Sequence, residues 1–265
     1  MGLYLGTAVL LFLCMFGLFL CALAVQDNSI IDIAYGPLFV LAGWLGYQFY
    51  GEDHPRQLLL LLLVSCWGLR LGLHILTRKQ GEDGEDPRYA KWRASWGKSF
   101  VWRSFLQIFM LQGLVIYLVA IPLLLVIDQP GGALNWLDLL GLVIWLSGFL
   151  FEAIGDWQLL HFKRDAANRG RIIQQGLWRY TRHPNYFGEA LLWWGIFLIA
   201  LHVPYGLFGI VSPLLINFLL LKVSGIPMLE EKYRGRADFE EYRRRTSAFF
   251  PWFPRPCGKE VCHDV

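Results

Sequence analysis

Residues 182–200 read Arg-His-Pro-Asn-Tyr-Phe-Gly-Glu-Ala-Leu-Leu-Trp-Trp-Gly-Ile-Phe-Leu-Ile-Ala, so a polar cluster runs directly into an apolar segment. The whole chain of 265 residues is 55% hydrophobic and 16% aromatic, with positive mean hydropathy. This composition is typical of membrane proteins rather than soluble ones. A polar cluster beside an apolar helix in such a protein is a candidate functional site.

Several segments are long enough to cross a bilayer, which takes roughly 20 mostly apolar residues. We count seven, of which the sixth is the shortest: 3–25, 31–50, 57–77, 104–127, 136–161, 186–202 and 205–225. The sequence therefore predicts an all-α, multi-pass membrane bundle of seven transmembrane helices, forming one domain over residues 1–265. The first segment lacks the basic start and short apolar run of a signal peptide, so we expect a retained helix.

The basic residues predict the orientation, because lysine and arginine accumulate in short cytoplasmic loops. All 24 lie beyond residue 55, and most fall within 78–103, 163–182 and the segment from 222 onward. With seven spans, the N-terminus is outside and 78–103, 162–185 and 226–265 form a cytoplasmic cap. The membrane would be the inner membrane of a bacterium or the endoplasmic reticulum of a eukaryote. The net charge is +3, and the basic residues do not form the clustered basic and aromatic face that is typical of nucleic-acid-binding proteins.

The five cysteines do not form a recognisable framework. Cys14, Cys21 and Cys66 fall within predicted spans, and Cys257 and Cys262 lie in the tail. Because no CxxC or Cys/His ligand spacing occurs, we predict neither disulfides nor a metal site.

The third span carries polar residues on one face. Trp67, Arg70, His74 and Arg78 follow one another at intervals of three, four and four residues. A single arginine near a helix end could simply extend its side chain to the interface. Because His74 and Arg78 lie on the same face, the alternative is that the three residues form a ridge that binds an anion.

Acidic residues occur in the second and fifth spans. Glu152, Asp156 and Lys163 share one face of the fifth span, and two carboxylates one turn apart need nearby cations or donors. Asp32 begins the second span, one turn before Tyr35. It is either a helix-start residue favoured by the helix dipole or a carboxylate beside a lipid-soluble substrate.

The sixth span begins at the polar cluster itself. Pro184 suits the first position of a helix. From there Asn185, Glu189 and Trp193 recur every four residues, which aligns an amide, a carboxylate and an indole along one face. A helix cap would account for Pro184 and Asn185, but not for Glu189 and Trp193, which lie further along the span.

These ridges suit a large anionic cofactor. Cations would hold its phosphates, and Asn185, Glu189 and Asp156 would hold a carboxamide or ribose. No GxGxxG or Walker loop occurs, so side chains of several helices would have to bind a dinucleotide.

At this point a family resemblance is visible. The run from Gly176 to Glu189, with Trp193 and Gly195, resembles the C-terminal signature of the steroid 5α-reductase family, in particular its bacterial-type DUF1295 branch. The similarity extends to 67–70 upstream and to 239–242 with Pro251 downstream. It implies NADPH-dependent reduction of a carbon–carbon double bond conjugated to a ketone, as in 3-oxo-Δ4 steroids.

The resemblance also implies roles for individual residues. Asp32 would approximate the acid near the substrate ketone. The steroid enzymes place a tyrosine opposite that acid on the third span, where the nearest residue here is Trp67, and Tyr35 is a candidate replacement. The segment 230–233 would close over the cofactor. The candidate cofactor-binding residues are Arg70, His74, Arg78, Glu152, Asp156, Lys163, Arg171, Tyr180, Arg182, His183, Asn185, Tyr186, Glu189 and Lys222.

Two other function classes stay open. Isoprenylcysteine and phospholipid methyltransferases share an Arg-His-Pro-x-Tyr core but bind S-adenosylmethionine, and Glu189 with Asn185 favours the reductases. A transporter or lipid-binding scaffold would also place charges in spans, although no inverted repeat is visible. The expected partners are a lipid-soluble enone substrate and membrane lipids, with no nucleic acid and no obligatory protein partner.

Overall fold

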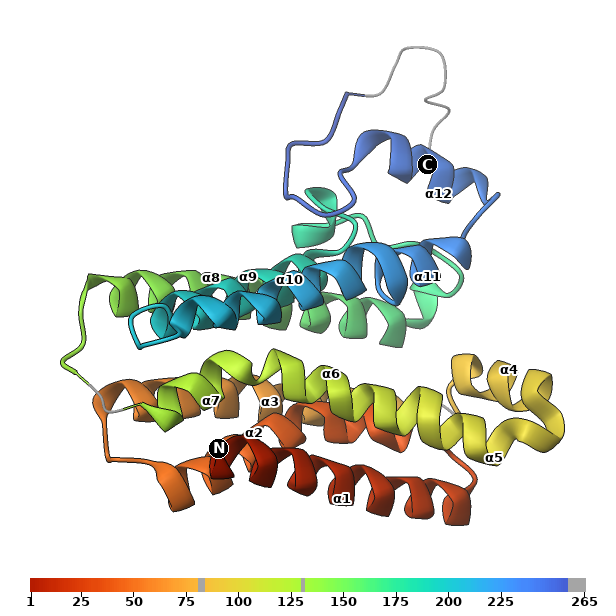
Figure 1. The fold of residues 1–265 in the computed structure, drawn as a ribbon. Coiled ribbons are helices and arrows are strands. Elements are labelled where there is room, and N and C mark those ends of the chain that lie inside the picture. Colours follow the sequence, from red (N-terminus) through yellow and green to blue (C-terminus); the bar gives the residue numbers. More distant parts are fainter. Residues whose placement is uncertain (81–83, 130–131, 257–265) are drawn as a thin grey trace. The chain divides into compact units, whose positions relative to one another are not determined.

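The computed structural model describes residues 1–80, 84–129 and 132–256, and within these ranges the chain is helical with no strand. One isolated bridge joins Thr181 to Ser247. The chain divides into two compact units (Figure 1). Unit 1 comprises Met1–Gly141 and Ile196–Leu215, and unit 2 comprises Leu142–Gly195 and Ile216–Val265.

Six helical segments among the described residues are long and apolar enough to cross a membrane, which confirms an all-α, multi-pass membrane protein. The sixth predicted span, 186–202, is present as α9 (Pro184–Ala200). Its 17 residues extend only about 25 Å, which is short of a bilayer core. The six are α1 (Gly2–Val25), α2 (Ile30–Tyr50), α3 (Pro55–Lys79), the run Pro87–Val119, α8 (Trp136–Arg164) and the run Gly206–Glu231.

Unit 1 is organised around the contact between α2 and α3, which Figure 1 shows side by side. A Cβ added to Gly36 would lie 2.3 Å from the carbonyl oxygen of Gly68, so the two backbones touch. Small residues permit this approach in membrane helices. Its other elements are α4 (Pro87–Trp96), η1 (Gly97–Ser99), α5 (Phe100–Arg103), η2 (Ser104–Met110), α6 (Leu111–Val119), α7 (Ile121–Asp128) and η5 (Gly206–Ile210).

The predicted span 104–127 is interrupted. It starts as the π-helix η2, continues as α6 and breaks at Ala120 before α7. Pro122 lies in the first turn of α7, where its missing N–H is tolerated but the preceding helix cannot continue through it. The break separates the run Pro87–Val119 from α7.

A buried ion pair fixes one end of unit 1. The Arg56 guanidinium donates from Nε and Nη2 to the two carboxylate oxygens of Asp138, at 2.7 and 2.8 Å. Each side chain is 2% exposed. Nη2 also donates to the carbonyl of Ala133 at 3.0 Å. The contact joins the start of α3 to the start of α8, two positions far apart in sequence.

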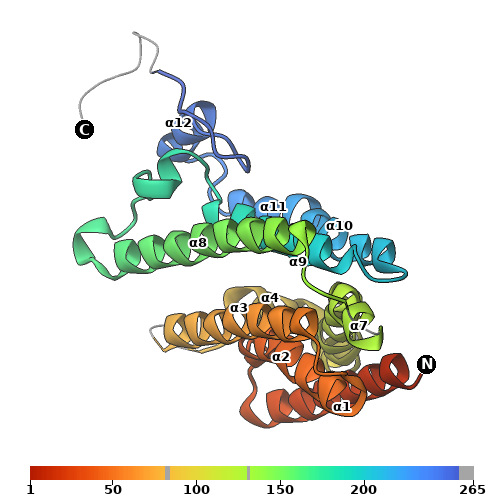
Figure 2. The same cartoon turned by 90° about the vertical axis from the view of Figure 1, so that its left-hand side faces the viewer.

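Unit 2 is built on a close crossing of α8 and α9, which Figures 1 and 2 both show side by side. A Cβ on Gly188 would lie 2.4 Å from the amide nitrogen of Glu152, and one on Gly148 would lie 2.5 Å from that of Leu192. The glycines therefore bring the polar faces of both helices together. Besides parts of α8, α9 and α10 (Val211–Phe218), this unit contains η3 (Ala166–Asn168), η4 (Gly176–Arg179), η6 (Leu219–Val223), α11 (Ile226–Glu231) and α12 (Ala237–Arg245).

Candidate functional site

The predicted site residues fall into both units. Unit 1 holds Asp32, Tyr35, Trp67, Arg70, His74 and Arg78. Unit 2 holds Glu152, Asp156, Lys163, Arg171, Tyr180, Arg182, His183, Asn185, Tyr186, Glu189 and Lys222.

In unit 1, Asp32 lies in the first turn of α2 and is held by two residues of α4. The Tyr89 hydroxyl donates to Oδ1 at 2.7 Å, and Nη2 of Arg88 donates to Oδ2 at 2.7 Å. The Tyr89 side chain is buried, at 4% exposure. Both bonds favour the charged form of the carboxylate, which burial opposes. Asp32 is thus part of a carboxylate, phenol and guanidinium cluster rather than a simple helix-start residue.

Tyr89 and Arg88 were not among the predicted site residues, although a signal for their position exists. Asp86 caps α4 by accepting a hydrogen bond from the backbone N–H of Arg88 at 2.9 Å, and Pro87 occupies the first helical position. An Asp-Pro pair is a common helix start. It places Arg88 and Tyr89 in the first turn, but it does not reveal which distant carboxylate they reach.

Charged contacts secure the surroundings of Asp32. Lys79 donates to Asp27 and Ser29, so α3 is tied to the connection before α2. Burial alone would raise the pKa of Asp27, but the hydrogen bonds from Lys79 and Ser29 outweigh it and lower that pKa. Arg78 and Asp32 line a hollow of about 10 Å³, which has room for roughly one water molecule. Arg78 of the third-span ridge therefore lies beside Asp32.

Tyr35 and Trp67 belong to an aromatic cluster. The ring centroids of Tyr35 and Trp67 are 6.4 Å apart, and Phe39 packs against both rings at 5.3 and 5.4 Å. Trp67 is fully buried. Arg70 and His74 lie on the same helix and are half-buried. Tyr35 and Trp67 therefore pack together in this cluster, and Tyr89 supplies a phenol next to Asp32.

In unit 2, the amide of Asn185 meets a carboxylate of α8. Its Nδ2 donates to Oδ1 of Asp156 at 3.1 Å. Asp156 and Glu152 are both buried on the crossing between α8 and α9, and Glu189 lies one turn beyond Asn185. The structure therefore joins Asn185 and Asp156, which the sequence places on polar faces of two different helices.

Glu230 of α11 connects the next two residues of the motif. Its Oε1 accepts from Nε of Arg182 at 2.9 Å and lies 3.1 Å from Nε2 of His183. Nη1 of Arg182 donates to the carbonyls of Arg243 and Thr246. Arg182 thus ties the motif to α11 and α12.

Two buried acceptor atoms of this cluster have no partner among the described residues. They are Nδ1 of His183 and Oδ1 of Asn185. When Nε2 of His183 carries the proton that it donates to Glu230, Nδ1 can only accept. Burial lowers the pKa of His183, although Glu230 partly offsets this effect. A ligand that fits here must bring hydrogen-bond donors.

The buried His183 predicts a pH dependence of stability. Its pKa is lowered in the folded state, so below about pH 6.5 the unfolded chain binds a proton that the folded chain does not. The free energy of unfolding should therefore fall with decreasing pH, by up to about 1.4 kcal/mol per unit, until the folded pKa is reached. Chemical unfolding between pH 7 and 5 measures this slope. His183→Gln should flatten it, and the exposed His202→Gln should not.

Four of the remaining candidates in unit 2 are exposed, and Tyr186 is half-buried. Lys163, Arg171 and Lys222 have exposed side chains, on α8, after η3 and in η6. Tyr180 contacts the ring of Phe253, with centroids 5.9 Å apart, and Tyr186 stacks on His183 at 5.5 Å. Lys163, Arg171 and Lys222 carry positive charge.

Comparison with known proteins places the chain in a family. A family model described as "Protein of unknown function (DUF1295)" matches residues 18–246. The chain belongs to the DUF1295 family. This family is related to the steroid 5α-reductases. The DUF1295 chain is 25% identical over 267 residues to an uncharacterized protein of Schizosaccharomyces pombe, C594.04c, covering 85% of this chain and 73% of that protein. No solved structure matches.

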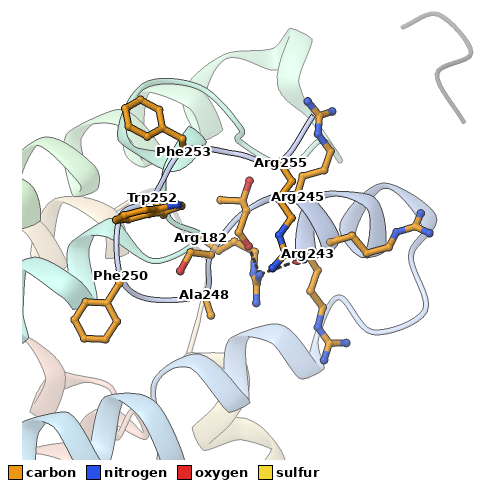
Figure 3. A pocket seen from close by; sticks show the side chains of 11 residues that line it. Arg182, Arg243, Arg245, Ala248, Phe250, Trp252, Phe253 and Arg255 are labelled. Atoms are coloured by element: carbon orange, nitrogen blue, oxygen red, sulfur yellow. Dashed lines mark hydrogen bonds between the residues drawn. The ribbon is translucent and has the colours of Figure 1, made fainter. Parts of the chain in front are cut away.

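This DUF1295 protein also has an arginine-lined hollow that the sequence reasoning missed. It has a volume of about 490 Å³ and lies between α12 and the segment that follows it (Figure 3). The run of three consecutive arginines in α12 was the available signal. The hollow is lined by Arg182, Arg243, Arg244, Arg245, Thr246, Ser247, Ala248, Phe250, Trp252, Phe253 and Arg255.

Proposed function

We propose that this protein is a membrane-embedded, NADPH-dependent reductase of a carbon–carbon double bond conjugated to a ketone in a lipid-soluble substrate. The pairing of the buried Tyr89 hydroxyl with Asp32 carries the proposal. The related steroid 5α-reductases make a 3-oxo-Δ4 steroid the first substrate to test.

Tyr89 has the chemistry that such a reaction needs. NADPH, when bound, supplies a hydride to the β-carbon of the enone. Negative charge then develops on the ketone oxygen, and a hydrogen bond to that oxygen stabilises it most where water is excluded. The Tyr89 hydroxyl donates to Asp32, so its proton is one for which a substrate oxygen can compete. The proton for the α-carbon would come from water.

Unit 2 fits the polar end of the cofactor. The nicotinamide carboxamide and the ribose hydroxyls carry N–H and O–H donors, which match the unpartnered acceptors of Asn185 and His183. Asp156 fixes the Asn185 amide so that Oδ1 remains the accepting atom. The exposed cations Lys163, Arg171 and Lys222 would serve the phosphates.

We also propose the finer membrane topology. α9 would form a seventh span with local thinning of the bilayer, which a short helix can cause at modest cost. The basic residues then lie on the cytoplasmic side and the N-terminus outside. The substrate would enter from the lipid, and the cofactor from the cytoplasm.

Cofactor binding can be tested on the detergent-purified protein. NADPH is expected to raise the melting temperature, and S-adenosylmethionine is not. Asn185→Leu should weaken NADPH binding by roughly tenfold, because one buried hydrogen bond is worth about 1–2 kcal/mol. Asn168→Leu, the same change in an amide that binds the carbonyl of Phe162 instead, is the matched control. Stabilisation by S-adenosylmethionine alone would favour a methyltransferase, and stabilisation by neither ligand would favour a carrier.

A further inference from the structure

The segment that follows α12 has a fixed course. Residues 246–255, here called the strap, are held by backbone hydrogen bonds at 2.9 Å from Trp252 to the carbonyl of Tyr180 and from Arg255 to that of Arg245. These bonds anchor the strap to η4 and to the end of α12. Side chains on the strap are therefore presented in defined directions.

Three large rings of the strap are mostly exposed. Phe250, Trp252 and Phe253 are 70%, 73% and 76% exposed, although their backbone is anchored. Figure 3 shows them on one side of the strap, with Arg243, Arg245 and Arg255 on the other. Clustered aromatic rings are enriched at the level of lipid head groups. In water, by contrast, such rings would be left uncovered at a cost.

The arginine side of the strap carries excess positive charge. Arg243 and Arg245 have exposed acidic neighbours on α12, each at 3.5 Å, and exposed pairs of this kind are weak. Arg244 and Arg255 have no acidic partner within the part of the chain that the structure describes. The fifth arginine, Arg182, is occupied by Glu230 and backbone carbonyls. The hollow thus offers guanidinium donors to an anion.

We propose that the arginine-lined hollow binds the phosphate of an anionic membrane lipid, with Phe250, Trp252 and Phe253 inserted at the lipid interface. The hollow of about 490 Å³ is open and lined by arginines, as a phosphate head group requires. The exposed rings favour a lipid over a soluble phosphate as the ligand. A lipid brings acyl chains that cover the rings, whereas a soluble ion leaves the rings in water. Six helices among the described residues are long and apolar enough to cross a membrane, so lipid is available as a ligand.

Native mass spectrometry of the full-length protein in neutral detergent tests the proposal. Phosphatidylglycerol should bind in preference to phosphatidylcholine with the same acyl chains. Each positive charge near an anionic head group contributes about fivefold, so Arg244→Gln with Arg255→Gln should weaken phosphatidylglycerol binding roughly thirtyfold. Arg169→Gln with Arg234→Gln removes the same charge outside the hollow and should have little effect.

A second pair of changes separates lipid from free phosphate. Trp252→Ala with Phe253→Ala should weaken phosphatidylglycerol binding while leaving the arginines in place. Equal occupancy by both lipids, or loss of bound lipid in competition with inorganic phosphate, would overturn the proposal. Displacement of the lipid by NADPH would also overturn it, since the hollow would then belong to a nucleotide site.

Discussion

Tyr89→Phe is expected to lower kcat for enone reduction by roughly 100- to 1,000-fold, the usual cost of removing one donor to a developing oxyanion. The change deletes only the hydroxyl that meets Asp32 at 2.7 Å. The ring keeps its edge contact with Trp92, whose centroid is 5.5 Å away. NADPH oxidation with a 3-oxo-Δ4 steroid, or with another enone that is turned over, measures the effect.

NADPH affinity should be unchanged in Tyr89→Phe, because the hydroxyl that is removed pairs with Asp32 and is not among the candidate cofactor-binding groups. Tyr47→Phe is the matched control. It also removes a hydrogen bond from a phenol to a carboxylate of unit 1, here Asp53, and should leave kcat near that of the native protein. Turnover by Tyr89→Phe at the native rate would exclude Tyr89 as the donor. Asp32→Asn would then decide whether the acid acts alone.

The helices were predictable because long apolar runs admit few alternatives in a membrane. The predicted spans 3–25, 31–50 and 57–77 each correspond to a single helix. The run 104–127 was not predictable as an interrupted segment, since hydropathy does not register the break before Pro122. The sixth span was predicted to be the shortest, and the corresponding α9 has only 17 residues.

The site was predictable where residues share a helix face and less so where they meet through tertiary contacts. Asn185 and Asp156 each lie on a readable helical stripe, and the structure joins them. Tyr89 lies 57 residues from Asp32, so no periodicity links the two. The same holds for Glu230, which reaches His183 from a segment 47 residues away. Side-chain pairing between elements depends on packing geometry that a single sequence does not encode in its spacing.

Arg56→Ala is expected to lower the free energy of unfolding by about 3–5 kcal/mol, although it lies outside the proposed site. The substitution leaves the Asp138 carboxylate buried without its guanidinium partner. It also strands the carbonyl of Ala133. Reversible chemical unfolding in detergent or bicelles measures the loss. Arg234→Ala, which breaks an exposed ion pair with Glu231, should change stability by no more than about 0.5 kcal/mol.

The double variant Arg56→Met with Asp138→Leu distinguishes the cost of an unpaired buried charge from the loss of the hydrogen bonds that the pair makes to the backbone. Because it removes both charges and keeps comparable volume, most of the lost stability should return. Recovery should stop short of the native value, since the backbone N–H of Asn135 loses its 2.8 Å bond to Asp138 and each stranded buried group costs about 1–3 kcal/mol. A double variant as unstable as Arg56→Ala would mean that the pair stabilises this end of unit 1 through its hydrogen bonds to the 133–135 backbone. A double variant more stable than the native protein would mean that desolvation of the two charges outweighs all of those bonds.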